Sequence, residues 1–321
     1  MSSNFKNLYT SNNPPLQATL IRGSNIESIH KIHAVITDKK GRVLMCAGNP
    51  EYKSFIRSAL KPFQAIPFVS SGAASKINNE SKSIALACGS HSGSKLHSRE
   101  AFKILWEYDI DINNLKCPKS MTSPLEHNCS GKHAAFLATC KKMNWPLDSY
   151  LKGDHPLQIE IFRIVSELLE IPSSEINAER DDCGAPTLYL KLLEMSRLYS
   201  LLSSSENAEL EQISRSMIIN PTMISDNNKF DTEIIKASHG NVIGKGGAEG
   251  IQCLCKVNEG IGLALKVEDG SKRAKHAVSL HLLKQLEWIS DLRIQDIEEK
   301  VFNFSEGVRL EVKGKVKFQE S

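Results

Sequence analysis

The first residues whose types and spacing could do chemistry are Ser58 and Lys61, in the stretch Arg57–Pro62 (RSALKP). When a lysine follows a serine by three residues at the start of a helix, the two side chains lie on the same face of the helix. A base must remove the proton of a serine hydroxyl before the oxygen becomes a strong nucleophile. Lysine is such a base when burial or a nearby cation, here Arg57, lowers its pKa. The alternative is a helix-capping serine beside a solvated lysine.

Two glycine-rich stretches could complete such a site. Cys88–Gly93 (CGSHSG) follows an apolar helical pattern, and its glycines and hydroxyls suit an anionic or oxyanion ligand. In Gly244–Gly250 (GKGGAEG) the order of glycine and lysine is not that of a phosphate loop. A lysine on a glycine-lined strand edge could still reach a neighbouring active site. The alternatives are a polar turn for the first stretch and a flexible turn with a solvated lysine for the second.

Two further stretches combine cysteine with charged side chains just before predicted helices: Glu126–His133 (EHNCSGKH) and Arg180–Pro186 (RDDCGAP). Cys129 could be a nucleophile or a soft metal ligand, with His127 or His133 as base or ligand. The second stretch could supply a metal ligand and an orienting carboxylate. The alternatives are a polar turn with a buried thiol and helix capping by aspartate.

The elements that must position these residues fall into two groups. Helical spacing of apolar residues predicts helices in the middle of the chain, at 61–72, 83–87, 96–108, 131–143, 156–169, 186–202 and 207–217. Short apolar runs predict a hairpin near the N-terminus and strands after residue 240, at 33–37, 42–47, 241–243, 250–256, 260–267 and 308–318. A last amphipathic helix is expected at 272–286. Strands from both chain ends could form one antiparallel sheet with the helices segregated, which is an α+β fold.

The composition excludes several classes of protein. The chain has 321 residues, of which 40% are hydrophobic and 24% charged, as in ordinary globular proteins. A net charge of +3 from scattered residues predicts no nucleic-acid partner. No apolar run is long enough for a membrane helix, and the polar start, expected to be a loose terminus over 1–16, lacks a signal peptide. Eight cysteines are too few for a disulfide scaffold, so we expect a cytoplasmic protein with free thiols or metal ligands.

In their joint order, these motifs resemble the asparaginase II family, the rhizobial-type or class 3 L-asparaginases. The resemblance runs from about residue 19 to about residue 274. The matching stretches lie at 22–28, 57–65, 89–93, 128–133, 182–186, 245–250 and 266–270.

The resemblance implies hydrolysis of L-asparagine to L-aspartate and ammonia by a single domain, 17–321, in a homodimer. It implies a layered α+β fold similar to glutaminases and serine β-lactamases. The implied catalytic groups are two Ser–Lys tandems, Ser58–Lys61 and Ser90–Lys245. The implied zinc ligands are Cys129, Lys132 and Cys183. The residues implied to bind substrate or to lie beside the zinc are Arg57, His91, His133, Asp181 and Gly247.

We expect neutral Lys61 to deprotonate Ser58, which attacks the side-chain amide carbon. Ser90 and Lys245 would assist proton transfer, while zinc orients the substrate or the site. A zinc-bound water as the nucleophile stays open.

Two other functions remain possible from the sequence. One is a serine amidase with another substrate, such as a glutaminase or a β-lactamase-like hydrolase. The other is a non-catalytic zinc or thiol sensor, which needs Cys129 and Cys183 but has no use for Ser58 and Lys61.

Overall fold

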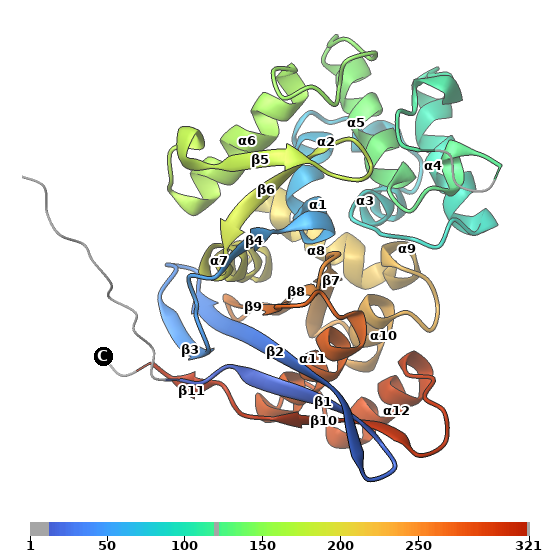
Figure 1. Cartoon of the computed structure of the whole chain (residues 1–321). Coiled ribbons are helices and arrows are strands. Elements are labelled where there is room, and N and C mark those ends of the chain that lie inside the picture. Colours follow the sequence, from blue (N-terminus) through green and yellow to red (C-terminus); the bar gives the residue numbers. More distant parts are fainter. Residues whose placement is uncertain (1–12, 119–121, 320–321) are drawn as a thin grey trace, which may run out of the picture.

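The main sheet is antiparallel and is built from both ends of the chain (Figure 1). A computed structural model describes residues 13–118 and 122–319. The path through the sheet is β10-β1-β2-β9-β8-β7. These strands span Leu16–Arg22 (β1), Asn25–Asp38 (β2), Val242–Gly246 (β7), Ile251–Lys256 (β8), Ile261–Val267 (β9) and Val308–Lys313 (β10). The predicted union of N-terminal and C-terminal strands in one antiparallel sheet is therefore confirmed.

The predicted N-terminal hairpin is present and carries a further edge strand. β3 (Val43–Ala47) pairs with β2 through a turn in which Asp38 Oδ1 accepts hydrogen bonds from two backbone N–H groups, at distances of 3.0 and 2.9 Å. β11 (Lys317–Phe318) then pairs with β3. The terminal strand predicted over 308–318 is divided into β10 and β11 around Gly314, whose φ of +100° favours glycine.

Helices cover both faces of this sheet, which makes three layers. β2, β8 and β9 send alternate side chains into two different apolar cores. One core includes Val35 and α7 (Leu192–Ser203), together with the helical middle of the chain. The other includes Ile36, α11 (Lys272–Gln285) and α12 (Asp291–Val301). The α+β fold class with α/β/α layers is confirmed.

The helical middle packs around α5, which is buried from Ser130 to Cys140. Its longer helices are α4 (Lys95–Glu107), α5 (Ser130–Lys142), α6 (Pro156–Leu169) and α8 (Ala208–Ile219). The shorter ones are α1 (Lys61–Gln64), α2 (Ile66–Ser70), α3 (Glu80–Ala87), α9 (Pro221–Ile224) and α10 (Phe230–Ala237). Single 3₁₀ turns occur at Arg57–Leu60 (η1), Ala74–Lys76 (η2), Ile112–Asn114 (η3), Pro124–Glu126 (η4) and Ser173–Glu175 (η5).

One predicted helix is half wrong. The stretch 186–202 begins as β6 (Pro186–Lys191), and only its second half is helical, as α7. β6 is the central strand of a small antiparallel sheet between β4 (Lys53–Phe55) and β5 (Asn177–Arg180). A proline is tolerated at the first residue of a strand as well as at the start of a helix, so Pro186 was an ambiguous signal.

Other differences are smaller. The helix expected at 61–72 is split into α1 and α2, and Pro67 lies in the first turn of α2. β1, β4, β5, α9, α10 and α12 were not predicted. The loose terminus expected over 1–16 lies outside the described residues up to residue 12, and Leu16 begins β1. Of the helices in the described ranges, none has the length and apolar character that a membrane span requires.

Candidate active site

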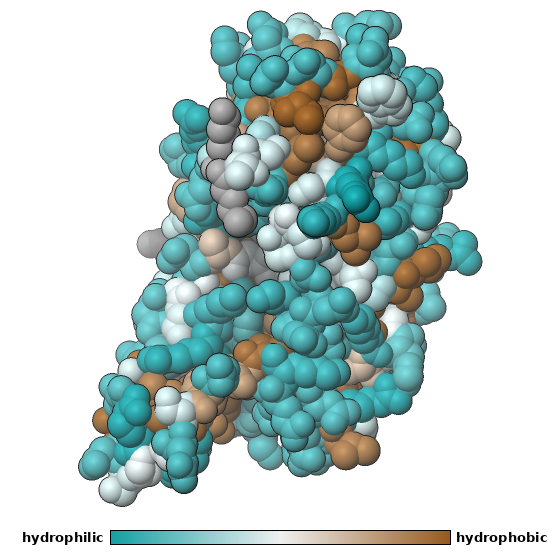
Figure 2. Space-filling model, turned by 90° about the vertical axis from the view of Figure 1, so that its right-hand side faces the viewer, coloured by the Kyte–Doolittle hydropathy of each residue, from teal (hydrophilic) through white to brown (hydrophobic). Residues whose placement is uncertain are grey.

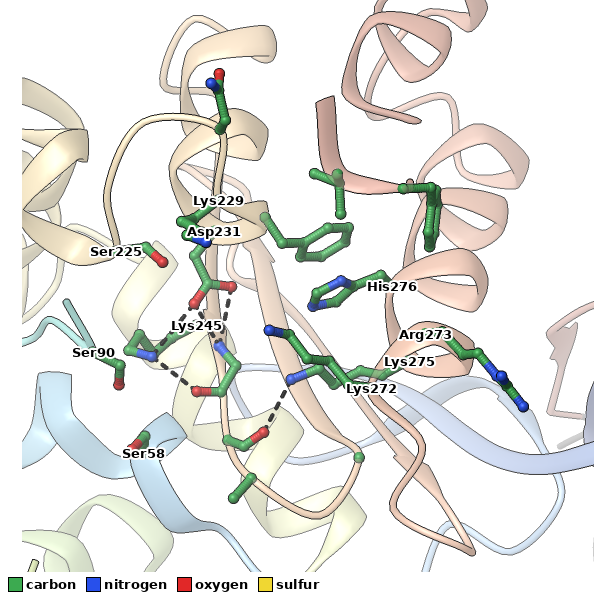
Figure 3. Close-up of a pocket in the computed structure, with 18 of the residues that line it drawn as sticks. Ser58, Ser90, Ser225, Lys229, Asp231, Lys245, Lys272, Arg273, Lys275 and His276 are labelled. Atoms are coloured by element: carbon green, nitrogen blue, oxygen red, sulfur yellow. Dashed lines mark hydrogen bonds and ion pairs between the residues drawn. The ribbon is translucent and has the colours of Figure 1, made fainter. Parts of the chain in front are cut away.

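A cavity of about 710 Å³ brings Ser58, Ser90 and Lys245 together, although they are far apart in the sequence. Ser58 comes from η1, Ser90 from the loop after α3, and Lys245 from β7 (Figure 3). The start of α11 and the residues that follow α12 form other parts of its wall. Gly247 lines the cavity as well, and a Cβ there would lie 2.7 Å from the Ile56 carbonyl oxygen, so the position needs glycine.

Ser58 lies on a turn that the unpredicted strand β6 holds in place. The backbone N–H of Arg57 donates to Thr187 Oγ1 at 3.0 Å, and Ile56 N–H donates to the Leu188 carbonyl at 3.0 Å. Arg57 has a φ of +53°, which is strained for a residue with a side chain and is typical of functional sites. In a 3₁₀ turn, residues three apart eclipse one another, so Ser58 and Lys61 lie on one side.

Lys61 is fully buried, and its side chain is surrounded by neutral acceptors. Its Nζ is 3.0 Å from Ser90 Oγ, 3.4 Å from the Asn128 carbonyl oxygen, and also bonded to the Gly89 carbonyl. Burial lowers the pKa of Lys61, and the nearby cations Lys245 and Lys132 lower it further, against the attraction of two cysteine sulfurs. Within the described ranges, no hydrogen bond joins Lys61 to Ser58, so the contact made by Lys61 is with the serine of the other predicted tandem.

The loop that carries Ser90 is fixed by its backbone and by His91. Ser90 N–H donates to the Ile224 carbonyl at 2.7 Å. His91 Nδ1 accepts from Gly93 N–H at 3.1 Å, which leaves Nε2–H to donate to Ser130 Oγ at 3.1 Å. Burial holds the pKa of His91 well below its usual range, so the ring is neutral. His91 therefore ties the Ser90 loop to the start of α5.

Lys245 is also buried, but its partner is a carboxylate. Lys245 Nζ is 3.4 Å from Asp231 Oδ2 and donates to the Gly246 carbonyl at 2.8 Å. Asp231, from α10, also accepts from Gly246 N–H at 2.9 Å and from Gln252 Nε2 at 2.9 Å. Burial raises the pKa of Asp231, but Lys245, Lys275 and these hydrogen bonds outweigh it and lower the pKa. Asp231 is therefore the buried counter-ion of Lys245.

Asp231 was missed by the sequence analysis. The described residues contain no hydrogen bond between Lys245 and Ser90, which the resemblance had paired. The register of β7 and β8, with Gly246 opposite Gln252, is what brings both donors to Asp231. No spacing in the sequence reveals that register.

The three predicted zinc ligands lie close together and are buried. Cys129 precedes α5, Lys132 lies in its first turn, and Cys183 lies in the loop between β5 and β6. Lys132 Nζ is 3.2 Å from Cys183 Sγ. A hydrogen bond from Cys129, together with Lys132 and His133, lowers the pKa of Cys183, although its burial acts in the opposite direction.

This set of donors fits a zinc ion. Thiolate sulfur is a preferred zinc ligand, and a lysine amine can join once it is deprotonated. His133 is fully buried, its Nδ1 is 2.7 Å from the Tyr150 hydroxyl, and its Nε2 has no hydrogen-bond partner in the described structure. Cys183 lies near that ring. In the described ranges no three His, Cys, Asp or Glu side chains form a metal cluster by themselves, so the fit depends on Lys132.

Arg57 links the serine turn to the cysteine loop. Its Nε donates to Asp181 Oδ1 at 2.9 Å, and its Nη2 is 2.5 Å from Asp182 Oδ2. The predicted neighbour Asp181 is therefore in contact with Arg57, and Asp182 shares that contact. His127 contacts the neighbouring backbone, because its Nδ1 accepts a hydrogen bond from Cys129 N–H at 3.1 Å.

The chain matches one family model along nearly its whole length. The model is that of L-asparaginase II, over residues 18–318. No curated protein matches the sequence. Among solved structures, the crystal structure of Mglu is 11% identical with a TM-score of 0.39, over 80% of this chain and 67% of that one. A β-lactamase from Mycobacterium bovis is 12% identical with a TM-score of 0.38, over 81% of this chain and 95% of that one.

Proposed function

Because the chain belongs to the asparaginase II family, and so to the asparaginase-type amidohydrolases, we propose that it hydrolyses L-asparagine to L-aspartate and ammonia. One observation supports this most. Lys61, which is buried and has no carboxylate partner among the described residues, contacts the hydroxyl of Ser90, and Ser90 lines the same cavity as Ser58. Such a pair suits the activation of a serine nucleophile.

The contacts of Lys61 match those of a neutral amine. A neutral amine has two N–H donors and one lone pair. Around Lys61 Nζ there are two carbonyl oxygens, of Gly89 and Asn128, and one hydroxyl, of Ser90. The carbonyls would accept the two N–H groups, while the lone pair accepts the hydroxyl proton. Lys61 is therefore the general base in our proposal.

The proposed reaction begins with attack of Ser58 Oγ on the amide carbon, as its proton passes through the Ser90 hydroxyl to Lys61. The protonated Lys61 then returns a proton through the Ser90 hydroxyl to the amide nitrogen, which leaves as ammonia. An ester on Ser58 remains. A water molecule that gives its proton to the same base hydrolyses the ester, so that aspartate is released and Ser58 is restored. Lys245, held as a cation by Asp231, would stabilise the negative oxygen of the tetrahedral intermediate.

Ser90 is a second candidate for the nucleophile, because it is the serine that Lys61 contacts. Brief incubation with substrate, acid quenching and peptide mass spectrometry would locate the acyl group. An acyl group on the peptide with Ser58 supports the proposed order. An acyl group on the peptide with Ser90 exchanges the roles of the two serines.

Cys129, Lys132 and Cys183 would hold the zinc ion that the family resemblance implies. A zinc ion at this place supplies a Lewis acid for a carbonyl oxygen or an anchor for the substrate. The protein itself contributes the link from this site to the catalytic turn, because Arg57 contacts Asp181 and Asp182.

The deciding experiment measures ammonia release from L-asparagine and from L-glutamine, and ring opening of a β-lactam, with and without a chelator. Turnover of asparagine above the other two supports the proposal. A preference for glutamine or the lactam would point to another serine amidase. A chain that binds zinc but releases ammonia from neither amide would be the zinc or thiol sensor. Unchanged kcat and KM after removal of zinc would make the metal unnecessary.

We also propose, on the family resemblance alone, a cytoplasmic homodimer. Light scattering after size-exclusion chromatography tests the dimer. A mass of one chain, 35.6 kDa, would contradict it.

A further inference from the structure

We propose that Lys275 binds the carboxylate of the substrate, so that the wall formed by the start of α11 is the subsite for the acidic end of a small amide. The inference rests on the proposed amidohydrolase function. It assigns a role to a residue that lies outside the two Ser–Lys tandems and outside the zinc ligands.

Lys275 has a buried ammonium group that is incompletely bonded. The residue is 6% exposed and lines the same cavity as Ser58 and Ser90. Its Nζ donates one hydrogen bond, to the Gly247 carbonyl at 3.0 Å (Figure 3). No carboxylate of the described residues forms an ion pair with it. An ammonium group has three donors, so two of them remain for a ligand.

The nearest carboxylate, Asp231, is already engaged. It bonds with Lys245, the backbone of Gly246 and the side chain of Gln252. One carboxylate therefore faces two buried lysines, Lys245 and Lys275, and leaves one positive charge without a counter-ion inside the cavity. Buried charges are normally paired, so an anion is the missing component.

The first turn of α11 adds to this positive charge. It reads Lys272-Arg273-Ala274-Lys275 and contains no acidic residue. Cations at the N-terminus of a helix are unfavourable because the helix dipole is positive there. Lys272 and Arg273 line the cavity beside Lys275, and Lys272 forms no ion pair within the described ranges. An anion bound at this wall would offset both the unpaired charge of Lys275 and the unfavourable interaction of these cations with the helix dipole.

L-Asparagine supplies such an anion at a suitable place in its structure. Its carboxylate carbon is three bonds from the amide carbon that Ser58 would attack. A carboxylate bound by Lys275 would fix the amide end of the substrate at the serines. The subsite thus selects amides that carry a nearby carboxylate, and it would disfavour the same amide once that charge is removed.

The test compares L-asparagine with its α-amide, in which a neutral carboxamide replaces the carboxylate. The wild-type chain should prefer asparagine by about 10- to 100-fold in kcat/KM, since hydrogen bonds to charged groups contribute on that scale. Lys275→Met should remove the preference by raising KM for asparagine alone, with kcat little changed. Lys275→Arg should restore part of it. Lys284→Met, an exposed lysine of the same helix paired with Asp291, is the control and should change nothing.

Two results would overturn the subsite. The first is equal turnover of both substrates by the wild-type chain, which decides the matter even if the Met variant fails to fold. The second is an equal rise of KM for both substrates in a folded Lys275→Met variant. That rise would mean that Lys275 only supports the Gly247 carbonyl.

A binding measurement separates this proposal from the proposed function. Calorimetry with L-aspartate and with succinate measures the affinity of wild-type and Lys275→Met chains without turnover. Binding that is lost in the variant supports the subsite. If the wild-type chain binds them but releases no ammonia from asparagine, the proposed function fails and the subsite stands.

Discussion

Two buried lysines line or border the same cavity, and their surroundings differ in kind. Lys61 is surrounded by two carbonyl oxygens and a serine hydroxyl. Lys245 has the carboxylate of Asp231 3.4 Å away. Both side chains are 1% exposed, so burial alone does not distinguish them. The two lysines differ in the group that each one contacts. Ser90 follows α3, whereas Asp231 lies in α10.

Burial disfavours the charged form of a lysine, whereas a carboxylate beside the amine favours it. Burial lowers the pKa of Lys61, which frees its lone pair for the serine proton. Asp231 stays ionised beside Lys245, because that lysine and Lys275 outweigh its burial. The lysines of the two predicted Ser–Lys tandems therefore have different partners in the structure, a serine hydroxyl for Lys61 and a carboxylate for Lys245.

The largest effect is expected from Lys61→Met. Without its base the chain cannot activate the serine, so kcat should fall by about 10²- to 10⁴-fold. Lys61→Arg should be equally inactive, because arginine keeps the charge but has no accessible neutral form. Ammonia release measures kcat, and circular dichroism establishes that both variants are folded. A folded Lys61→Arg variant with near wild-type activity would refute the base.

Asp231→Asn tests the other lysine through stability. The change removes the carboxylate that pairs with Lys245, so that this buried side chain, like that of Lys275, has no counter-ion among the described residues. Removal of one partner from a buried ion pair lowers the free energy of unfolding by about 3–5 kcal/mol. Denaturant unfolding measures this loss. The matched control is Asp291→Asn, which removes an exposed pair with Lys284 and should cost less than about 1 kcal/mol. Equal losses of unfolding free energy in both variants would show that Asp231 does not act as a buried counter-ion.

The sequence allowed prediction of the residues that meet, because each lies in a short motif rich in functional groups. Ser58, Ser90 and Lys245 were predicted from these motifs together with the family resemblance, and the structure places all three at one cavity. The sheet built from both chain ends was predicted as well, from short apolar runs that alternate with turn residues.

What the sequence did not allow was the pairing between these residues. Lys61 lies three residues from Ser58 and yet bonds to Ser90, because the loop after α3 returns to the start of α1. Asp231 contacts Lys245 only through the register of β7 with β8 and the position of α10. The strand β6, which holds the Ser58 turn, was read as a helix because Pro186 suits either element. Contacts of this kind are set by tertiary packing, which local spacing does not encode.

The pH dependence of kcat/KM sharpens the contrast further. Lys61 must be neutral to accept a proton, so activity should be lost as the pH falls through its pKa. Burial lowers that pKa from an ordinary value of 10.5, so the rising limb of the profile should lie below 10.5. A rising limb at or above pH 10.5 would contradict the lowered pKa of Lys61.

The smallest effect is a shift of that limb in Lys245→Met, and it tests whether the two lysines sense each other. The positive charge of Lys245 is one of the causes that lower the pKa of Lys61. Its removal should raise that pKa, so the rising limb of kcat/KM should move to higher pH even where overall activity is reduced. Normalised profiles of the wild type and the variant measure the shift, and Lys284→Met should show none. If the limb stays in place, Lys245 does not influence the charge of Lys61. The two lysines would then act independently, and burial rather than the charge of Lys245 would lower the pKa of Lys61.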